Sequence, residues 1–152
     1  MSVLKYRRTE SKVEYVNVAN EIYTRTLAFL TRLSARYSRL MAERVSTLAA
    51  GVLDNAEMAN SIYPSDERRA ELREAHLLEA RAALMALDVH LAHCYDVMML
   101  NPEGCFQTKS GKPVEKYNAT RRLEGMAQTL GELIDKEAAL LSGVIKQCKK
   151  SA

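Results

Sequence analysis

The sequence is poor in residues that interrupt helices and lacks the features of exported or membrane proteins. It has no Trp, 2 Phe, 3 Pro and 6 Gly among 152 residues. No apolar run approaches the ~20 residues that a membrane-spanning helix needs. The first ten residues, MSVLKYRRTE, lack the apolar core of a signal peptide. We therefore expect a cytoplasmic protein that does not enter a membrane.

The cysteines and histidines lack the spacing of a disulfide framework or a metal site. The three cysteines form no CxxC pair; they are Cys94, Cys105 and Cys148. His76, His90 and His93 lie in the same predicted helix, and His90 and His93 are three residues apart. However, no Glu-x-x-His motif of a di-iron bundle occurs. No P-loop, nucleophile elbow or dinucleotide fingerprint occurs either. These absences predict a protein that is not an enzyme and holds no metal or cofactor.

What the chain does contain is a globular composition rich in helix formers. Apolar residues make up 47% and charged residues 27%, and Ala, Leu, Glu, Arg and Met dominate the middle of the chain. We expect one domain over residues 1–152, with a basic tail at about 1–10 and a loop at about 101–112.

Apolar residues recur at steps of three and four in four segments, the spacing of one helical face. We expect helices over about 11–33, 39–62 and 65–100, and a fourth that begins after Pro113. No segment alternates like a strand. The sequence therefore predicts an all-α, up-down-up-down four-helix bundle.

The connections have recognisable caps. Residues 35–37 are predicted to join the first two helices, with capping hydroxyls from Ser34 and Ser38. Pro64 should end the second helix, and Ser65 should cap the third.

Each predicted helix has an apolar face. In the first helix it comprises Val13, Val16, Tyr23, Leu27 and Leu30, widened by Ile22 and Phe29. In the second it comprises Met41, Val45, Leu48, Val52, Ala56 and Ala59, with Gly51 allowing close packing. In the third it comprises Leu77, Ala80, Leu84, Leu87, Leu91, Cys94 and Met98. In the fourth it comprises Leu123, Met126, Leu130, Leu133, Glu137, Leu140 and Val144. A charge in a core needs compensation, so Glu137 should lie near a cation such as Arg81, or at an oligomer interface.

Charge is distributed unevenly along the chain. The formal net charge is +3, but residues 1–44 carry +5, residues 45–104 carry −6 and residues 105–152 carry +4. Such asymmetry indicates an anionic partner or self-association, and equally suits basic helices that pack beside an acidic one.

Three groups of basic residues are candidates for binding nucleic acid, although a solvated basic face explains them as well. Arginines within reach of one another suit phosphate. The N-terminal group is Lys5, Arg7, Arg8 and Lys12. The second group, which would line one solvent face if the helix nearly persists, is Arg25, Arg32, Arg36 and Arg39. The third group is Lys109, Lys112, Lys116, Arg121 and Arg122.

Four stretches carry a resemblance to a known family. They are VEYVNVANEIYTRTLAFL, ARYSRLMAERVSTLAAGVLDNAEMANSIYP, LREAHLLEARAALMALDVHL and DKEAALLSGVIK. Over residues 11–147 the chain resembles the accessory variability determinant (Avd) proteins of diversity-generating retroelements, in the four-helix-bundle group that includes the 23S rRNA intervening-sequence proteins. The most specific parts are Arg36–Tyr37, ANSI at 59–62 and LSGVIK at 141–146. The loop at 101–112 is long for this family.

The resemblance implies a function and an assembly. It implies a homopentamer with basic surfaces that associates with a reverse transcriptase and with its template RNA, or DNA, and supports mutagenic cDNA synthesis without catalysing it. The alternatives are an intervening-sequence-type protein with unknown partners and an oligomeric adaptor that binds no RNA.

Overall fold

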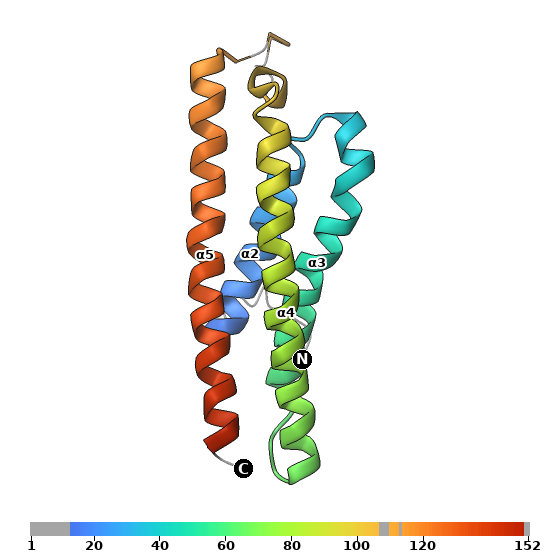
Figure 1. Cartoon of the computed structure of the whole chain (residues 1–152), viewed down its shortest axis with the longest axis vertical. Helices are drawn as coiled ribbons and strands as arrows, with labels where there is room; N and C mark the ends of the chain where they lie inside the picture. Colours follow the sequence, from blue (N-terminus) through green and yellow to red (C-terminus); the bar gives the residue numbers. More distant parts are fainter. Residues whose placement is uncertain (1–12, 107–109, 113, 151–152) are drawn as a thin grey trace.

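The computed structural model describes residues 13–106, 110–112 and 114–150, which form an all-α bundle (Figure 1). Its long helices are α2 (Glu14–Leu30), α3 (Ala35–Ser61), α4 (Glu67–Met98) and α5 (Lys116–Lys150). A short 3-10 helix, η1 (Pro102–Cys105), follows α4. Successive long helices run in opposite directions, so the predicted up-down-up-down four-helix bundle is confirmed. Among the described helices, none combines the length and apolar character needed to cross a membrane.

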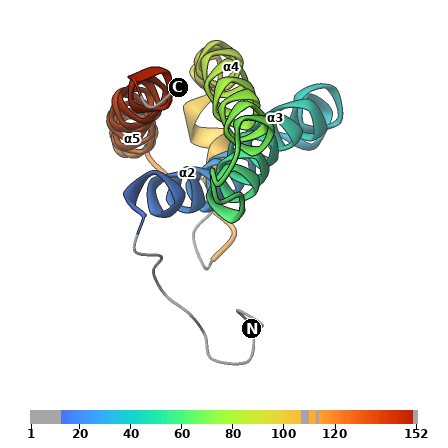
Figure 2. The same ribbon diagram turned by 90° about the horizontal axis from the view of Figure 1, so that it is seen from below.

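The four helices pack in a ring, in the order of the chain. α2 packs against α3 and α5, and α4 packs against the same two helices from the opposite side. Figure 2, which looks along the bundle from below, shows α2 and α4 at opposite edges. The first turns of α3 lean away from the other helices in Figure 1, and Leu40 in this part of α3 is 75% exposed.

The first connection lies earlier than predicted. α2 ends at Leu30, and Ser34 caps α3 by accepting a hydrogen bond from the backbone N–H of Tyr37. The backbone N–H of Ser38 already donates to the carbonyl of Ser34 at 2.8 Å. Residues 35–37 are therefore the first turn of α3, because a helix begins at the first hydroxyl that satisfies its open N–H groups.

The second connection also differs in its cap. α3 ends at Ser61, ahead of Pro64 as predicted, but Ser65 does not cap α4. Asp66 does: its carboxylate accepts from the backbone N–H of Arg69 at 2.8 Å. A carboxylate at the positive end of a helix gains dipole stabilisation that a hydroxyl lacks. The hydroxyl of Ser65 instead accepts from the Arg69 guanidinium.

The core faces of α3 and α4 largely follow the predicted pattern. All seven predicted core residues of α4 are buried, from Leu77 to Met98. In α3, Met41 and Leu48 are only half-buried, while Ala49 is fully buried. A Cβ atom at Gly51 would lie 3.6 Å from the Cβ of Ala83 in α4. The two helices do approach closely at Gly51, yet the gap accommodates a methyl group.

The core faces of α2 and α5 are rotated from the predicted ones. In α2, Leu27 is 39% exposed and Thr26 is buried instead. In α5, Ile134, Leu141 and Ile145 are buried, whereas their predicted neighbours are only half-buried; these are Leu133, Leu140 and Val144. Adjacent apolar pairs such as Leu133–Ile134 and Leu140–Leu141 fit two neighbouring stripes equally well, and periodicity alone does not decide which member of each pair faces the core.

Candidate nucleic-acid interface

Two groups of predicted basic residues meet at one end of the bundle. At this end α2 and α4 finish, and α3 and α5 begin (Figure 1). A small cavity of about 110 Å³ lies between the two connections and is lined by Arg32, Tyr37, Leu100 and Cys105, among others. We call this the basic end; its described basic residues are Arg32, Arg36, Arg39, Lys112, Lys116, Arg121 and Arg122.

The centre of the basic end is an aromatic ring between two arginines. Phe106, directly after η1, is buried with 6% of its surface exposed. The guanidinium carbon of Arg32 lies 4.7 Å from the ring centroid, and that of Arg122 lies 5.5 Å from it. Arg32 comes from the α2–α3 connection and Arg122 from the second turn of α5. Cation–π attraction to one ring thus holds together two cations that would otherwise repel each other.

Arg32 is held at this position without an acidic partner. Its Nε atom is buried and has no hydrogen-bond partner within the described part of the chain. The neighbouring thiol of Cys105 faces the carbonyls of Met98 and Asn101 at 3.8 and 3.6 Å. Burial raises the pKa of this thiol, and the Arg32 cation lowers it only in part. Cys105 is therefore a poor nucleophile, and among the described residues no carboxylate pairs with Arg32.

A second arginine–aromatic pair lies on the surface of the same end. Arg121 donates to the hydroxyl of Tyr117 at 3.2 Å, and its guanidinium carbon lies 5.8 Å from the ring centroid. Both side chains are exposed, and Tyr117 is 63% exposed. An exposed aromatic ring next to a cation is the arrangement on which unpaired bases stack.

The other basic residues are less concentrated. Arg36 and Arg39 are exposed on the first turns of α3, and Lys112 and Lys116 are exposed before and at the start of α5. Outside the described residues lie Lys5, Arg7, Arg8, Lys12 and Lys109.

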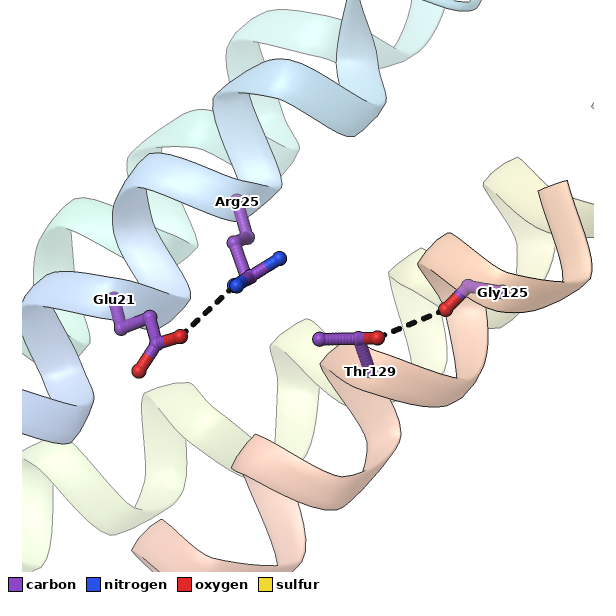
Figure 3. Close-up of polar contacts among 4 residues, drawn as sticks. All are labelled: Glu21, Arg25, Gly125 and Thr129. Atoms are coloured by element: carbon purple, nitrogen blue, oxygen red, sulfur yellow. Dashed lines mark hydrogen bonds and ion pairs between the residues drawn. The ribbon is translucent and has the colours of Figure 1, made fainter. Parts of the chain in front are cut away.

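The condition under which Arg25 would share one face with the later arginines, a nearly continuous helix, is not met. The helix breaks between Leu30 and Ala35, and Arg25 instead forms an ion pair of 3.0 Å with Glu21. Figure 3 shows this contact within α2, and a hydrogen bond from Thr129 to the carbonyl of Gly125 within α5. The face predicted from spacing requires a continuous helix, which the Ser34 cap interrupts.

Acidic side chains border the basic end. Glu103 and Glu115 lie in the α4–α5 connection. Farther along, burial and then the carboxylates of Glu124 and Asp96 raise the pKa of Tyr95. The basic end thus comprises the end of α2 and the starts of α3 and α5, with carboxylates at its border.

Glu137 lies outside the basic end and has no cation beside it. Its side chain is fully buried, and neither carboxylate oxygen has a hydrogen-bond partner in the described ranges. Burial raises its pKa to about 8. The prediction of a pair with Arg81 is wrong: Arg81 is half-buried on α4 and forms no ion pair with Glu137. At neutral pH the Glu137 carboxyl is therefore mostly protonated, because burying a neutral carboxyl group costs less free energy than burying a carboxylate without a cation.

Two histidines of α4 bind side chains of α3. The Nδ1 atom of His76 lies 3.0 Å from Oδ1 of Asn55, and Nε2 of His90 accepts from Nε of Arg44 at 3.4 Å. His93 is exposed. Among the described residues no cluster of three side chains suited to hold a metal ion occurs.

Phe106 and Tyr117 were missed by the sequence patterns. Both stand next to basic residues in the chain, in CFQTK and EKYNATRR. An aromatic residue close to basic residues in the sequence is a pattern from which both could have been predicted. The contact between Arg32 and Phe106 could not, because only the fold brings these two residues together.

Comparison of the chain with known families, proteins and structures found no match: no family model, no curated protein and no solved structure matches it.

Proposed function

We propose that this protein is a non-catalytic, nucleic-acid-binding accessory subunit that acts in the cytoplasm. Its partners would be the reverse transcriptase and the template RNA, or DNA, of a diversity-generating retroelement. Two lines of support exist: the resemblance in sequence to the Avd family, and the basic end. The observation that carries the proposal is the convergence of Arg32 and Arg122 on Phe106.

The basic end is suited to a phosphate backbone. The guanidinium group of arginine offers planar, forked donors that match phosphate oxygens. Arg32 and Arg122 present two such groups on one buried ring, so little side-chain entropy remains to be lost on binding. Tyr117 offers a stacking surface one turn from this pair. Recognition would rest on phosphates and RNA shape rather than on base edges.

Self-association would strengthen this weak site. The resemblance implies a homopentamer, and a ring would repeat the basic end around its axis. Linked sites bind a long polyanion far more tightly than a single site does. Release of counterions from each contacted phosphate would make the binding strongly dependent on salt.

The test is RNA affinity as a function of salt for the full chain and two matched double variants. R32Q/R122Q removes two charges from the basic end. R68Q/K146Q removes two exposed charges at the start of α4 and near the end of α5. We expect R32Q/R122Q to weaken binding and to reduce the slope of log affinity against log salt by about 0.7 per lost phosphate contact. The control pair should leave both nearly unchanged.

Two results would overturn the proposal. One is equal loss of affinity in both double variants, which would mean that only net charge matters. The other is no RNA binding by the wild-type chain even at low salt. Circular dichroism of all variants confirms that the helices remain intact. Copurification with a reverse transcriptase encoded beside this gene tests the partner.

The alternative is an oligomeric bundle of the intervening-sequence type that binds no RNA. An exposed apolar face on α4 favours it, because that face requires a protein neighbour rather than a polyanion.

A further inference from the structure

α4 has apolar residues on two opposite faces. One face is the buried stripe from Leu77 to Met98, which packs in the core. On the opposite side a second stripe, which we call the outer stripe, is exposed along its whole length. Its members are Leu78, Ala82, Met85, Val89 and Ala92.

The outer stripe consists of residues that a surface helix normally buries. Met85 is 66% exposed, Val89 56% and Leu78 39%. Steps of four, three, four and three residues place all five members within one helical face. Single exposed apolar residues are ordinary, but a continuous stripe marks an interaction site. A helix that is apolar on both faces is typically covered on both.

Nothing within the described part of the chain covers the outer stripe. α4 packs against α3 and α5, and these contacts leave its outer side free. Figure 2 shows α4 at the edge of the bundle opposite α2. A straight helix can therefore approach α4 from outside along several turns.

We propose that the outer stripe binds a second copy of this chain, with the two α4 helices antiparallel across a two-fold axis at Met85. Such an axis brings each residue before position 85 next to one that is equally far after it. Leu78 and Ala92 are each seven residues from Met85, so a large side chain meets a small one. Ala82 and Val89, three and four residues from Met85, also bring a small side chain against a larger one, with an offset of one residue. The stripe is thus complementary to itself in the antiparallel direction.

Charges on both sides of the stripe fit the same arrangement. Arg81 and Asp88 lie on one flank, four residues before and three after Met85. Across the two-fold axis, each Arg81 meets the Asp88 of the second copy. Glu79 and His93 lie on the other flank, six residues before and eight after Met85, so they approach each other with an offset of two residues. In a parallel two-fold pair each flank would face the opposite flank, so Arg81 would not meet Asp88; the Arg81–Asp88 contact is specific to the antiparallel arrangement.

These flanking charges are available for a second copy. None of the four forms an ion pair with another described residue. Asp88, Glu79 and His93 are exposed, and Arg81 is half-exposed. The contact involves neither Arg32 nor Arg122, so the inference goes beyond the proposed function and does not depend on RNA binding. A two-fold contact closes with two subunits, whereas a ring of five uses a different, head-to-tail contact.

The first test is a disulfide on the axis. The test uses the full chain with the background changes C105S and C148S. In this background M85C should form a disulfide with the same position of the second copy under mild oxidation. Only a residue near the two-fold axis lies close enough to the same residue of the second copy to do so. Q128C, on the exposed face of α5, is the matched control and should remain a monomer on a non-reducing gel. Equal crosslinking of the two variants, or none for M85C, would overturn the proposal.

The second test is a charge swap measured by sedimentation. R81E or D88R alone should weaken the dimer about tenfold, because each places two like-charged pairs across the axis. The double variant R81E/D88R restores opposite charges and should return the dissociation constant close to the wild-type value. A wild-type chain that stays monomeric, or a dimer whose dissociation constant neither single variant changes, would contradict the proposal.

Discussion

The guanidinium carbon of Arg32 lies 4.7 Å from the ring centroid of Phe106, although 73 positions of the chain separate the two residues. Arg122 lies against the same ring at 5.5 Å. The ring therefore joins the α2–α3 connection to α5, and it sets the spacing of the two cations that we propose to bind phosphate.

Replacing Phe106 by Leu tests this role of the ring. F106L keeps most of the buried apolar area but removes the cation–π attraction, which contributes about 0.5–1 kcal/mol per arginine. We expect RNA affinity to fall by a few fold while the helices remain folded. F29L is the matched control, because Phe29 is the other phenylalanine and is buried, and none of the described arginines lies against its ring. It should lower thermal stability without a change in RNA affinity, and a loss of affinity in both variants would count against the role of the ring.

Glu137 makes the stability of the protein depend on pH. Its pKa is about 8 when folded and 4.5 as a free side chain, so between these values the folded state holds a proton that the unfolded state has released. The stabilisation by this proton is complete below pH 4.5 and is lost as the pH rises to about 8, at up to about 1.4 kcal/mol per pH unit.

The variant E137Q isolates that contribution, because glutamine is neutral at every pH. In urea titrations across this range, the difference in unfolding free energy between E137Q and wild type should grow with pH in favour of E137Q. E132Q, an exposed change on the same helix, should run parallel to wild type. Parallel curves for E137Q and wild type would show that the buried carboxyl is not titrating in this range.

Gly51 offers a stabilising substitution. A helix-interior Gly costs about 1 kcal/mol relative to Ala, and a Cβ at this position would be in ordinary contact with Ala83 at 3.6 Å. G51A should therefore raise the unfolding free energy by about 1 kcal/mol, whereas G51V should lower it because larger groups meet Ala83. Chemical denaturation of the two variants measures both effects, and destabilisation by G51A would mean that α3 and α4 pack more tightly here than the contact indicates.

Asp66 and Ser65 distinguish two assignments of the cap of α4. Loss of an N-cap side chain costs about 1 kcal/mol. D66A should therefore destabilise the protein by about that amount, and S65A should have a much smaller effect, since Ser65 contacts only the exposed Arg69 side chain. The reverse order in denaturation experiments would restore Ser65 as the cap.

The sequence predicted some features of the helices correctly and misplaced others. The core stripe of α4 was predicted without error. In α5 the same rhythm was wrong by one residue at Ile134, Leu141 and Ile145, because each has an apolar neighbour and periodicity alone does not decide which of the two faces the core. Ser34, one of the two predicted capping hydroxyls, does cap α3. The cap of α4 was misplaced by one position, from Asp66 to Ser65, since neighbouring polar residues compete for the same open N–H groups.

The sequence by itself determined the helices, their number, their alternating directions and the burial of one face of each, because these follow from periodicity and short connections. The tertiary structure alone decided which charges meet. Arg32 lies against Phe106 and beside α5, Arg25 is turned to Glu21, and Glu137 is left without a cation. Such contacts join residues far apart in the chain, and they depend on how the helices rotate and end relative to one another, which no local pattern records.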